Sequence, residues 1–114
     1  MAAPMPDPAR PYDPRRDMQV TSARSRPGPG NSIHWTVTLR NASSVVAFRD
    51  PLYFSTYRDE HGAVVDERHE RIKDIFEPGA VRTIELNDGY ARARFTTADL
   101  RIAAAEALIP VPPR

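Results

Sequence analysis

The fold class of this 114-residue chain is decided by one stretch, Ser32-Ile33-His34-Trp35-Thr36-Val37-Thr38-Leu39-Arg40. From Ile33 to Leu39, large apolar residues alternate with polar ones, and this period of two is typical of a strand with one face in a core and one in water. Trp35 is the only tryptophan of the chain and stands in the middle of the run. We therefore expect an antiparallel β-domain in which Trp35 is buried in the core.

Turn compositions divide the remaining sequence into short segments. Pro51 is expected to begin a strand, because proline cannot donate to a central ladder. Residues 96–109 fit either an alanine-rich helix or a final strand, and the all-β surroundings favour the strand. About seven short strands with frequent turns predict an immunoglobulin-like antiparallel sandwich over residues 17–110. Further strands are expected over residues 17–25, 52–57, 63–76, 80–86 and 90–95, and turns at residues 26–31, 41–44, 59–62, 78–79 and 87–89.

Proline is concentrated near the N-terminus, where residues 1–16 hold five of the twelve prolines of the chain. Proline removes a backbone donor and favours an extended backbone, so we expect residues 1–16 to form a disordered tail. Such a tail is either a spacer from a membrane anchor or a preceding domain, or a dispensable terminus. Residues 111–114 are expected to form a frayed C-terminus.

The composition excludes several classes of protein. The net charge is only +1, which argues against a nucleic-acid-binding module held by charge alone. The chain has no cysteine, so disulfides and thiolate metal ligands are excluded. No stretch approaches the roughly 18 apolar residues of a membrane span, and the N-terminal region lacks the apolar segment of a signal peptide. We expect either a cytoplasmic protein or one from which a leader or anchor has been removed, and the extracytoplasmic location is favoured.

No catalytic or metal-binding residue is predicted. His34, His61 and His69 are dispersed along the chain, whereas a metal site needs three converging ligands. The acidic residues between 59 and 74 alternate with arginine and lysine, which is the normal composition of a solvated face rather than of two catalytic carboxylates. The common nucleophile, phosphate-loop and dinucleotide motifs do not occur. We therefore expect no enzymatic activity and no cofactor, and a small hydrolase is the least favoured alternative.

Two short motifs admit a second interpretation. Asn41-Ala42-Ser43 matches the N-glycosylation sequon, but a turn after the strand is the simpler interpretation. Arg92 and Arg94, with Tyr90 and Phe95 beside them, are similar to the basic and aromatic face with which OB-folds bind single-stranded nucleic acid. The other interpretation of this group is that the aromatic residues belong to the core and the arginines face water.

Three turn and core signals occur in a definite order along the chain. They are Asn41-x-Ser43, then Phe54-x-x-Tyr57-x-Asp59-x-x-Gly62, then Pro78-Gly79. This order resembles the FxLYD-type and related immunoglobulin-like modules of bacterial cell-envelope proteins, over residues 17–109, with departures at Pro51 and over residues 63–77. The resemblance implies an extracytoplasmic, often membrane-tethered domain without catalytic residues, so no site residue is transferred from the family.

The expected function is that of a non-catalytic protein-interaction or structural accessory module of a bacterial cell envelope, with a protein partner and without nucleic acid. Any membrane tether is expected to lie in a segment that this chain does not contain. An antiparallel sandwich leaves strand edges with unpaired backbone groups, to which a partner can add a strand. We expect docking at such an edge or within residues 59–77, where the candidate residues are Arg68, Glu70, Arg71 and Lys73. The alternative is the OB-like nucleic-acid-binding domain.

Overall fold

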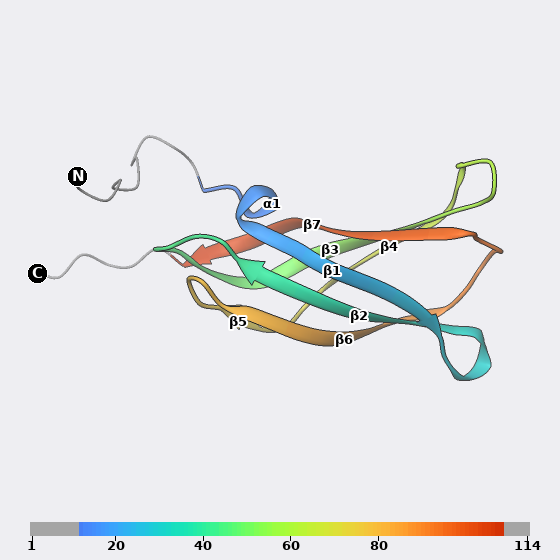
Figure 1. Cartoon of the computed structure of the whole chain (residues 1–114), viewed down its shortest axis with the longest axis horizontal. Helices are drawn as coiled ribbons and strands as arrows, with labels where there is room; N and C mark the ends of the chain where they lie inside the picture. The colour runs from blue at the N-terminus through green and yellow to red at the C-terminus, as the bar shows by residue number, and fades with distance from the viewer. Residues whose placement is uncertain (1–11, 109–114) are drawn as a thin grey trace, which may run out of the picture.

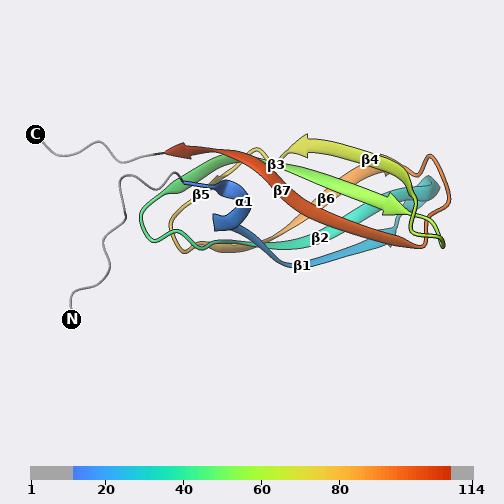
Figure 2. The same ribbon diagram turned by 90° about the horizontal axis from the view of Figure 1, so that it is seen from above.

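The computed structural model of the chain describes residues 12–108. Within that range, seven strands form two antiparallel sheets that pack face to face, which confirms the predicted all-β sandwich (Figures 1 and 2). A helical turn precedes the first strand and a 3-10 turn follows it. The last strand confirms the strand prediction made for residues 96–109 as far as the described residues reach. The elements are α1 (Pro14–Asp17), β1 (Met18–Pro27), η1 (Pro29–Asn31), β2 (Ser32–Asn41), β3 (Ala47–Arg58), β4 (Val64–Arg71), β5 (Ile75–Phe76), β6 (Val81–Tyr90) and β7 (Thr97–Leu108).

The two sheets meet differently along the two long sides of the sandwich. The first sheet has the order β1-β2-β6, and in the second sheet β3 is central, with β7 along one edge and β4 and β5 along the other. On one side β1 contacts β7 and α1 packs against both (Figure 1), and we name it the closed side. On the other side arginine side chains bridge β6 to the edge of the second sheet, and we name it the open side.

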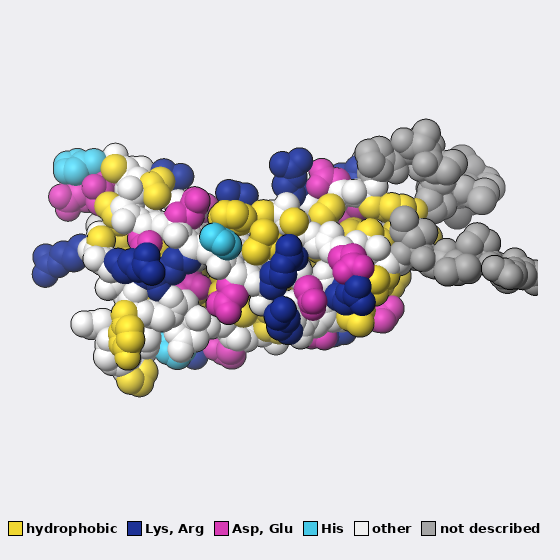
Figure 3. Space-filling view, turned by 180° about the vertical axis from the view of Figure 1, so that it is seen from behind, with side chains coloured by type: hydrophobic (Ala, Val, Ile, Leu, Met, Phe, Trp, Pro, Cys, Tyr) yellow, Lys and Arg dark blue, Asp and Glu magenta, His cyan; other side chains and the backbone are white. Residues whose placement is uncertain are grey.

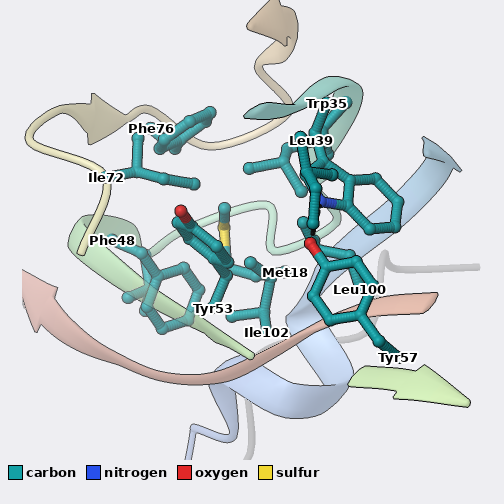
Figure 4. Close-up of a cluster of buried hydrophobic side chains, with 13 residues drawn as sticks. Met18, Trp35, Leu39, Phe48, Tyr53, Tyr57, Ile72, Phe76, Leu100 and Ile102 are labelled. Carbon is teal, nitrogen blue, oxygen red and sulfur yellow. Dashed lines mark hydrogen bonds between the residues drawn. The ribbon is translucent and has the colours of Figure 1, made fainter. Parts of the chain in front are cut away.

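The alternation in β2 determines the core. Ile33, Trp35, Val37 and Leu39 all point between the sheets and are buried, and Trp35 is only 1% exposed, as predicted. Figure 4 shows the Trp35 ring directed across the layer toward Tyr57 of β3. One continuous cluster of apolar side chains therefore joins the two sheets. Its other buried members are Met18, Val46, Phe48, Tyr53, Ile72, Phe76, Leu100 and Ile102.

Asn41 ends β2 with its side chain fully buried. Its Nδ2 donates to the carbonyls of Val46 and Phe76 at 2.8 and 2.9 Å, and its Oδ1 accepts the Ser43 N–H at 3.0 Å. The last bond closes the turn that the Asn-Ser sequence predicts. Because the amide is enclosed and bonded, Asn41 is a structural residue that ties the end of β2 to the start of β3 and to β5.

β3 is longer than expected, and the expectation that Pro51 begins a strand is wrong. β3 begins before Pro51 and passes through it. The register against β7 shifts between Arg49 and Leu52, and Asp50 has a φ of 49°, which together mark a bulge. The Pro51 carbonyl accepts the Ile72 N–H at 2.9 Å. A bulge tolerates a residue without an N–H, which explains how a central strand contains proline.

β6 is also longer than expected, and the expected turn at residues 87–89 is wrong. The strand continues to Tyr90 because a register shift against β2 accommodates an extra residue. Gly89 has a φ of 77°, a conformation that fits a bulge as well as a turn. The expected strand over residues 90–95 is wrong too, because residues 91–96 form the loop that crosses from the first sheet to the second.

The expected disordered tail is wrong for residues 12–16, which fold against the sandwich. Tyr12 is partly buried against the core, and Asp13 caps α1 by accepting a backbone N–H of the first turn at 3.0 Å. The folded domain therefore begins earlier than the sequence indicated. The rest of the expected tail, residues 1–11, and the expected frayed end, residues 111–114, lie outside the described residues.

Candidate docking site

The four residues predicted to bind a partner belong to β4 and to the segment that follows it. β4 is an edge strand, because within the described residues it pairs only with β3. Its register places Arg68 and Glu70 opposite residues of β3 that point into the core, so both are directed toward the first sheet. Arg71 is exposed on the outer side of β4, and Lys73 follows the strand. The four side chains therefore do not all stand on one face of β4.

Arg68 links the two sheets at one end of the open side. Its guanidinium donates to the backbone carbonyls of Asp88 and Tyr90 on β6 and to the Asp66 carboxylate, with Nη2 and Oδ2 2.8 Å apart. The side chains of Arg68 and Asp66 are only 14% and 10% exposed. Removing one partner of such a pair leaves a charge without compensation. Arg68 is therefore a structural residue rather than a surface charge that steers a partner.

Arg82 links the two sheets at the other end of the open side. Its Nη1 lies 2.5 Å from Oδ2 of Asp74, in the segment between β4 and β5. Its guanidinium also lies 5.0 Å from the centre of the Phe76 ring, a cation–π contact. The hydrogen bond from Arg82 lowers the pKa of Asp74 below its usual value. Two arginine bridges, one from each sheet, therefore bound the open side.

A cleft of about 410 Å³ lies between the two arginine bridges, and we name it the open cleft. One wall is formed by residues 70–74 of the second sheet and the other by residues 84–87 of β6. Its lining combines apolar side chains (Tyr53, Ile72, Ile84, Leu86) with charged and polar ones (Glu70, Arg71, Lys73, Asp74, Glu85, Asn87). Three of the four predicted partner-binding residues therefore line one cleft, and Arg68 marks its end.

β6 forms one wall of the open cleft and has an unpaired edge within the described residues. In an antiparallel ladder the backbone groups of successive residues point to alternate sides. The Asn41 N–H donates to the Ala80 carbonyl at 2.9 Å. Asn41 and Ala80 are the neighbours of Arg40 and Val81, which lie opposite each other. A bond between these neighbours means that Arg40 and Val81 do not bond to each other through their backbones. The backbone groups that point away from β2, along the free edge, are therefore those of Val81, Thr83, Glu85 and Asn87.

A buried polar network crosses between the sheets behind the open cleft. The Asp88 carboxylate accepts hydrogen bonds from Trp35 Nε1 at 3.1 Å, Tyr53 OH at 2.9 Å, Ser55 Oγ at 2.5 Å and Tyr57 OH. Trp35 Nε1 also lies 2.9 Å from the Tyr57 hydroxyl (Figure 4). We name these five residues the Asp88 network. Because one carboxylate of the first sheet receives donors from both sheets, it acts as a cross-link between them.

The Asp88 network keeps its two tyrosines protonated. Burial and the neighbouring Asp88 charge raise the pKa of Tyr53 well above its usual value. Burial and the hydrogen bond to Asp88 raise the pKa of Tyr57 to about 12. Both hydroxyls are therefore donors at neutral pH, and the Asp88 oxygens are occupied by donors of the fold. A general base must face the proton that it removes, so this geometry suits stabilisation of the fold rather than catalysis.

Nothing in the immediate sequence of Asp88 predicts this network, because an Asp-Gly pair indicates a turn. A signal exists in β3, where Tyr53, Ser55 and Tyr57 recur at every second position on the face that enters the core. Buried hydroxyl groups need hydrogen-bond partners. Three of them on one inward face therefore predict an acceptor on the facing sheet, although they do not identify which residue it is.

The residues of the nucleic-acid-binding alternative lie where the loop between β6 and β7 crosses from one sheet to the other. Arg92 and Arg94 are exposed in this loop beside a cavity of about 1100 Å³, and Tyr90 is 70% exposed. Phe95 differs from them, because its ring packs 4.8 Å from that of Tyr57 and contacts the core. The four residues therefore do not form one stacking surface, and only the Tyr90 ring is free for a base.

The histidines do not converge within the described part of the chain. His34 Nε2 lies 3.0 Å from Ser32 Oγ, His61 is exposed in the loop before β4, and the His69 ring packs against Phe54. Among the described residues, no group of three or more His, Asp or Glu side chains is placed to bind a metal ion. Figure 3, seen from behind the view of Figure 1, shows basic and acidic side chains interleaved rather than gathered by sign.

We compared the chain with protein-family models, curated proteins and solved structures, and none of them matches it. The resemblance to FxLYD-type modules therefore stays a prediction. The helical turns among the described residues are too short to cross a membrane. The function has to be inferred from the geometry of the open side.

Proposed function

We propose that this protein is a non-catalytic interaction module that binds an extended segment of a partner protein at the open cleft. The observation that supports this function is the free edge of β6, whose outward backbone groups run beside a cleft of about 410 Å³. A partner strand that adds to this edge gains main-chain hydrogen bonds, and its alternate side chains enter the cleft. We place this role in a bacterial cell envelope because the order of turn and core signals resembles that of FxLYD-type modules.

The side chains around the open cleft suit an extended partner. Ile84 and Leu86 line the cleft from β6 and are only partly buried. Covering them stabilises the complex by about 25 cal/mol per Å² of apolar surface. Arg71 and Lys73 stand on the facing wall, and Lys73 has no ion-pair partner within the described residues. The favoured partner therefore alternates apolar residues and carries an acidic residue that can approach Lys73.

The test is a selection of extended peptides against the purified protein, followed by mapping of each bound peptide through backbone NMR shifts. We expect bound peptides to shift the amides of β6 and of residues 70–74. The double variant Arg71→Glu with Lys73→Glu should weaken binding by about tenfold. The matched control is Arg92→Glu with Arg94→Glu, which reverses two exposed charges away from the cleft and should bind as the parent protein does.

Two results would contradict the proposed function. In the first, the selected peptides bind, but they shift only residues outside β6 and residues 70–74. In the second, the folded protein returns no binding peptide at all from a selection made at a concentration where sedimentation gives a monomer. Either result removes strand addition at the open cleft as the activity of this protein.

The second candidate is an OB-like nucleic-acid-binding domain, and it is favoured by the exposed Tyr90 ring beside Arg92 and Arg94. A single-stranded oligonucleotide should then bind with an affinity that falls steeply as the salt concentration rises. If Arg92→Glu with Arg94→Glu abolishes that binding, and Arg71→Glu with Lys73→Glu does not change it, the nucleic-acid-binding function replaces the protein-binding one.

A further inference from the structure

We propose that the free edge of β6 pairs with a second copy of this chain. Two molecules then meet with their β6 strands antiparallel about a two-fold axis at Ile84, and two three-stranded sheets merge into one of six strands. This inference rests on the proposed function, because it names the partner that occupies the same edge. Four observations support it, which are the state of the other edges, the register, the charge of the edge and the composition of the terminal segments.

The other three strand edges of the sandwich are protected against strand addition. β1 and β7 contact each other and α1, and β1 has a bulge between Val20 and Ser22 and ends in Pro27. β4 is protected by charge, because most of its residues are acidic or basic. Bulges, proline and charged side chains are the usual protections of an edge strand. Residues 81–87 of β6 contain no proline and no register shift, so among the strands of residues 12–108 this edge is the one open to pairing.

The register about Ile84 makes the edge complementary to itself. The backbone groups of Val81, Thr83, Glu85 and Asn87 point outward. A two-fold axis at Ile84 places Thr83 opposite Glu85 of the second copy, and Val81 opposite its Asn87, as hydrogen-bonded pairs. A register displaced to centre on Glu85 instead places two glutamates directly opposite each other, which is unfavourable. The register centred on Ile84 therefore avoids the contact between two glutamates that the register centred on Glu85 contains.

The charged side chains of residues 81–87 already form ion pairs within a single molecule. Its two charged residues are Arg82 and Glu85, and each already has a partner within its own chain. Arg82 lies 2.5 Å from Asp74, and Glu85 lies 3.0 Å from Arg26. Two copies of this edge therefore approach without a large repulsion between like charges. Beyond residue 87 the carbonyls are bound by Arg68, so the available stretch ends there.

The chain's own terminal segments are poor alternatives for this edge. Residues 1–11 contain four prolines, and residues 109–114 contain three. Proline cannot donate to a strand ladder and is excluded from all but special positions in a sheet. A strand that pairs along residues 81–87 is therefore better supplied by another molecule, and β6 itself is the segment that fits.

The test is sedimentation equilibrium of the full chain from about 1 µM to about 500 µM. We expect a reversible monomer–dimer equilibrium in this range. Thr83→Pro removes an N–H that points outward, so it preserves the ladder with β2 and should leave the protein monomeric at all concentrations. The matched control is Glu67→Pro on the edge of β4, which should leave the dimer intact. A circular dichroism melt checks that each variant folds.

A pair of charge variants keeps the test valid if the proline variant does not fold. Thr83→Glu opposes Glu85 of the second copy and should weaken the dimer by at least tenfold. Adding Glu85→Lys to it places opposite charges across the axis and should restore the dimer. A monomer at every concentration overturns this inference and leaves the proposed function standing if selected peptides still bind at β6. A dimer that Thr83→Glu does not weaken uses another surface, and it overturns the inference as well.

Discussion

The two long sides of the sandwich are joined in different ways. On the closed side, β1 lies against β7 and α1 packs on both, so the packing of these elements and their apolar side chains joins the sheets. On the open side, β6 is joined to the second sheet by polar side chains, through Arg68, Arg82 and the Asp88 network. The closed side is held by neighbouring elements, whereas the open side is held by a few specific hydrogen bonds.

This difference explains why the open cleft and the free edge of β6 occur on the open side. Two arginine bridges and the partly buried Asp88 carboxylate hold the sheets together at the open side without covering the edge of β6. On the closed side the helical turn covers the edges that α1 contacts. The same protein thereby has one side that resists strand addition and one side that is suited to it.

The largest expected effect comes from Trp35, which serves both the common core and the Asp88 network. Trp35→Ala should cost about 3–5 kcal/mol of unfolding free energy, as large-to-small core substitutions do. Urea denaturation followed by circular dichroism measures the loss. Tyr90→Ala is the control, because its ring is 70% exposed and the change should stay within about 0.5 kcal/mol. Equal losses for the two variants would contradict the buried position of Trp35.

Asp88→Ala should have the next largest effect and should separate the two sides. It leaves the buried donors of Trp35, Tyr53, Ser55 and Tyr57 without their shared acceptor, at a cost of about 3 kcal/mol. Hydrogen exchange should speed up more in β6 and β4 than in β1. Glu85→Ala, on the same strand but exposed, should change the unfolding free energy little. An even loss of protection over both sides would show that Asp88 does not join the open side.

The Asp88 network should also make the protein sensitive to alkali. The pKa of Tyr57 in the folded protein is about 12, above the usual value of 10, so its stabilising contribution is complete below pH 10 and is lost as pH rises through 12. The loss is on the order of 2 kcal/mol. Thermal melts from pH 8 to pH 12 measure it, with Tyr90→Phe as a control that keeps the same profile. A flat stability profile above pH 10 is the result that argues against this prediction.

The two arginine bridges should differ in their contribution to stability. Arg68→Met should cost about 1–2 kcal/mol, because it leaves two carbonyls and a nearly buried Asp66 without their donor. Arg82→Met should cost below about 1 kcal/mol, because its ion pair with Asp74 is more exposed. Chemical denaturation of both variants compares them directly. If Arg82→Met lost more unfolding free energy than Arg68→Met, the Arg82 bridge would be the more stabilising one, contrary to this prediction.

The sequence predicts features that depend on local alternation, and it misses those that depend on contacts between distant strands. The alternation around Trp35 predicts β2 and the core correctly, and the all-β context predicts the last strand. The bulge at Pro51 and the strand position of Asp88 were missed, because both depend on register with a partner strand. Arg68 was assigned to the surface for the same reason, since its carbonyl partners lie about twenty residues away in sequence.

The central claim is that residues 81–87 of β6 form a free edge in the single molecule. Residue-resolved hydrogen exchange tests it most directly, at a concentration where sedimentation gives a monomer. The amides of Arg82, Ile84 and Leu86 point toward β2 and should be protected, whereas those of Val81, Thr83, Glu85 and Asn87 should exchange fast. Equal protection along the whole stretch, or protection in the opposite alternation, would contradict the free edge and the docking function inferred from it.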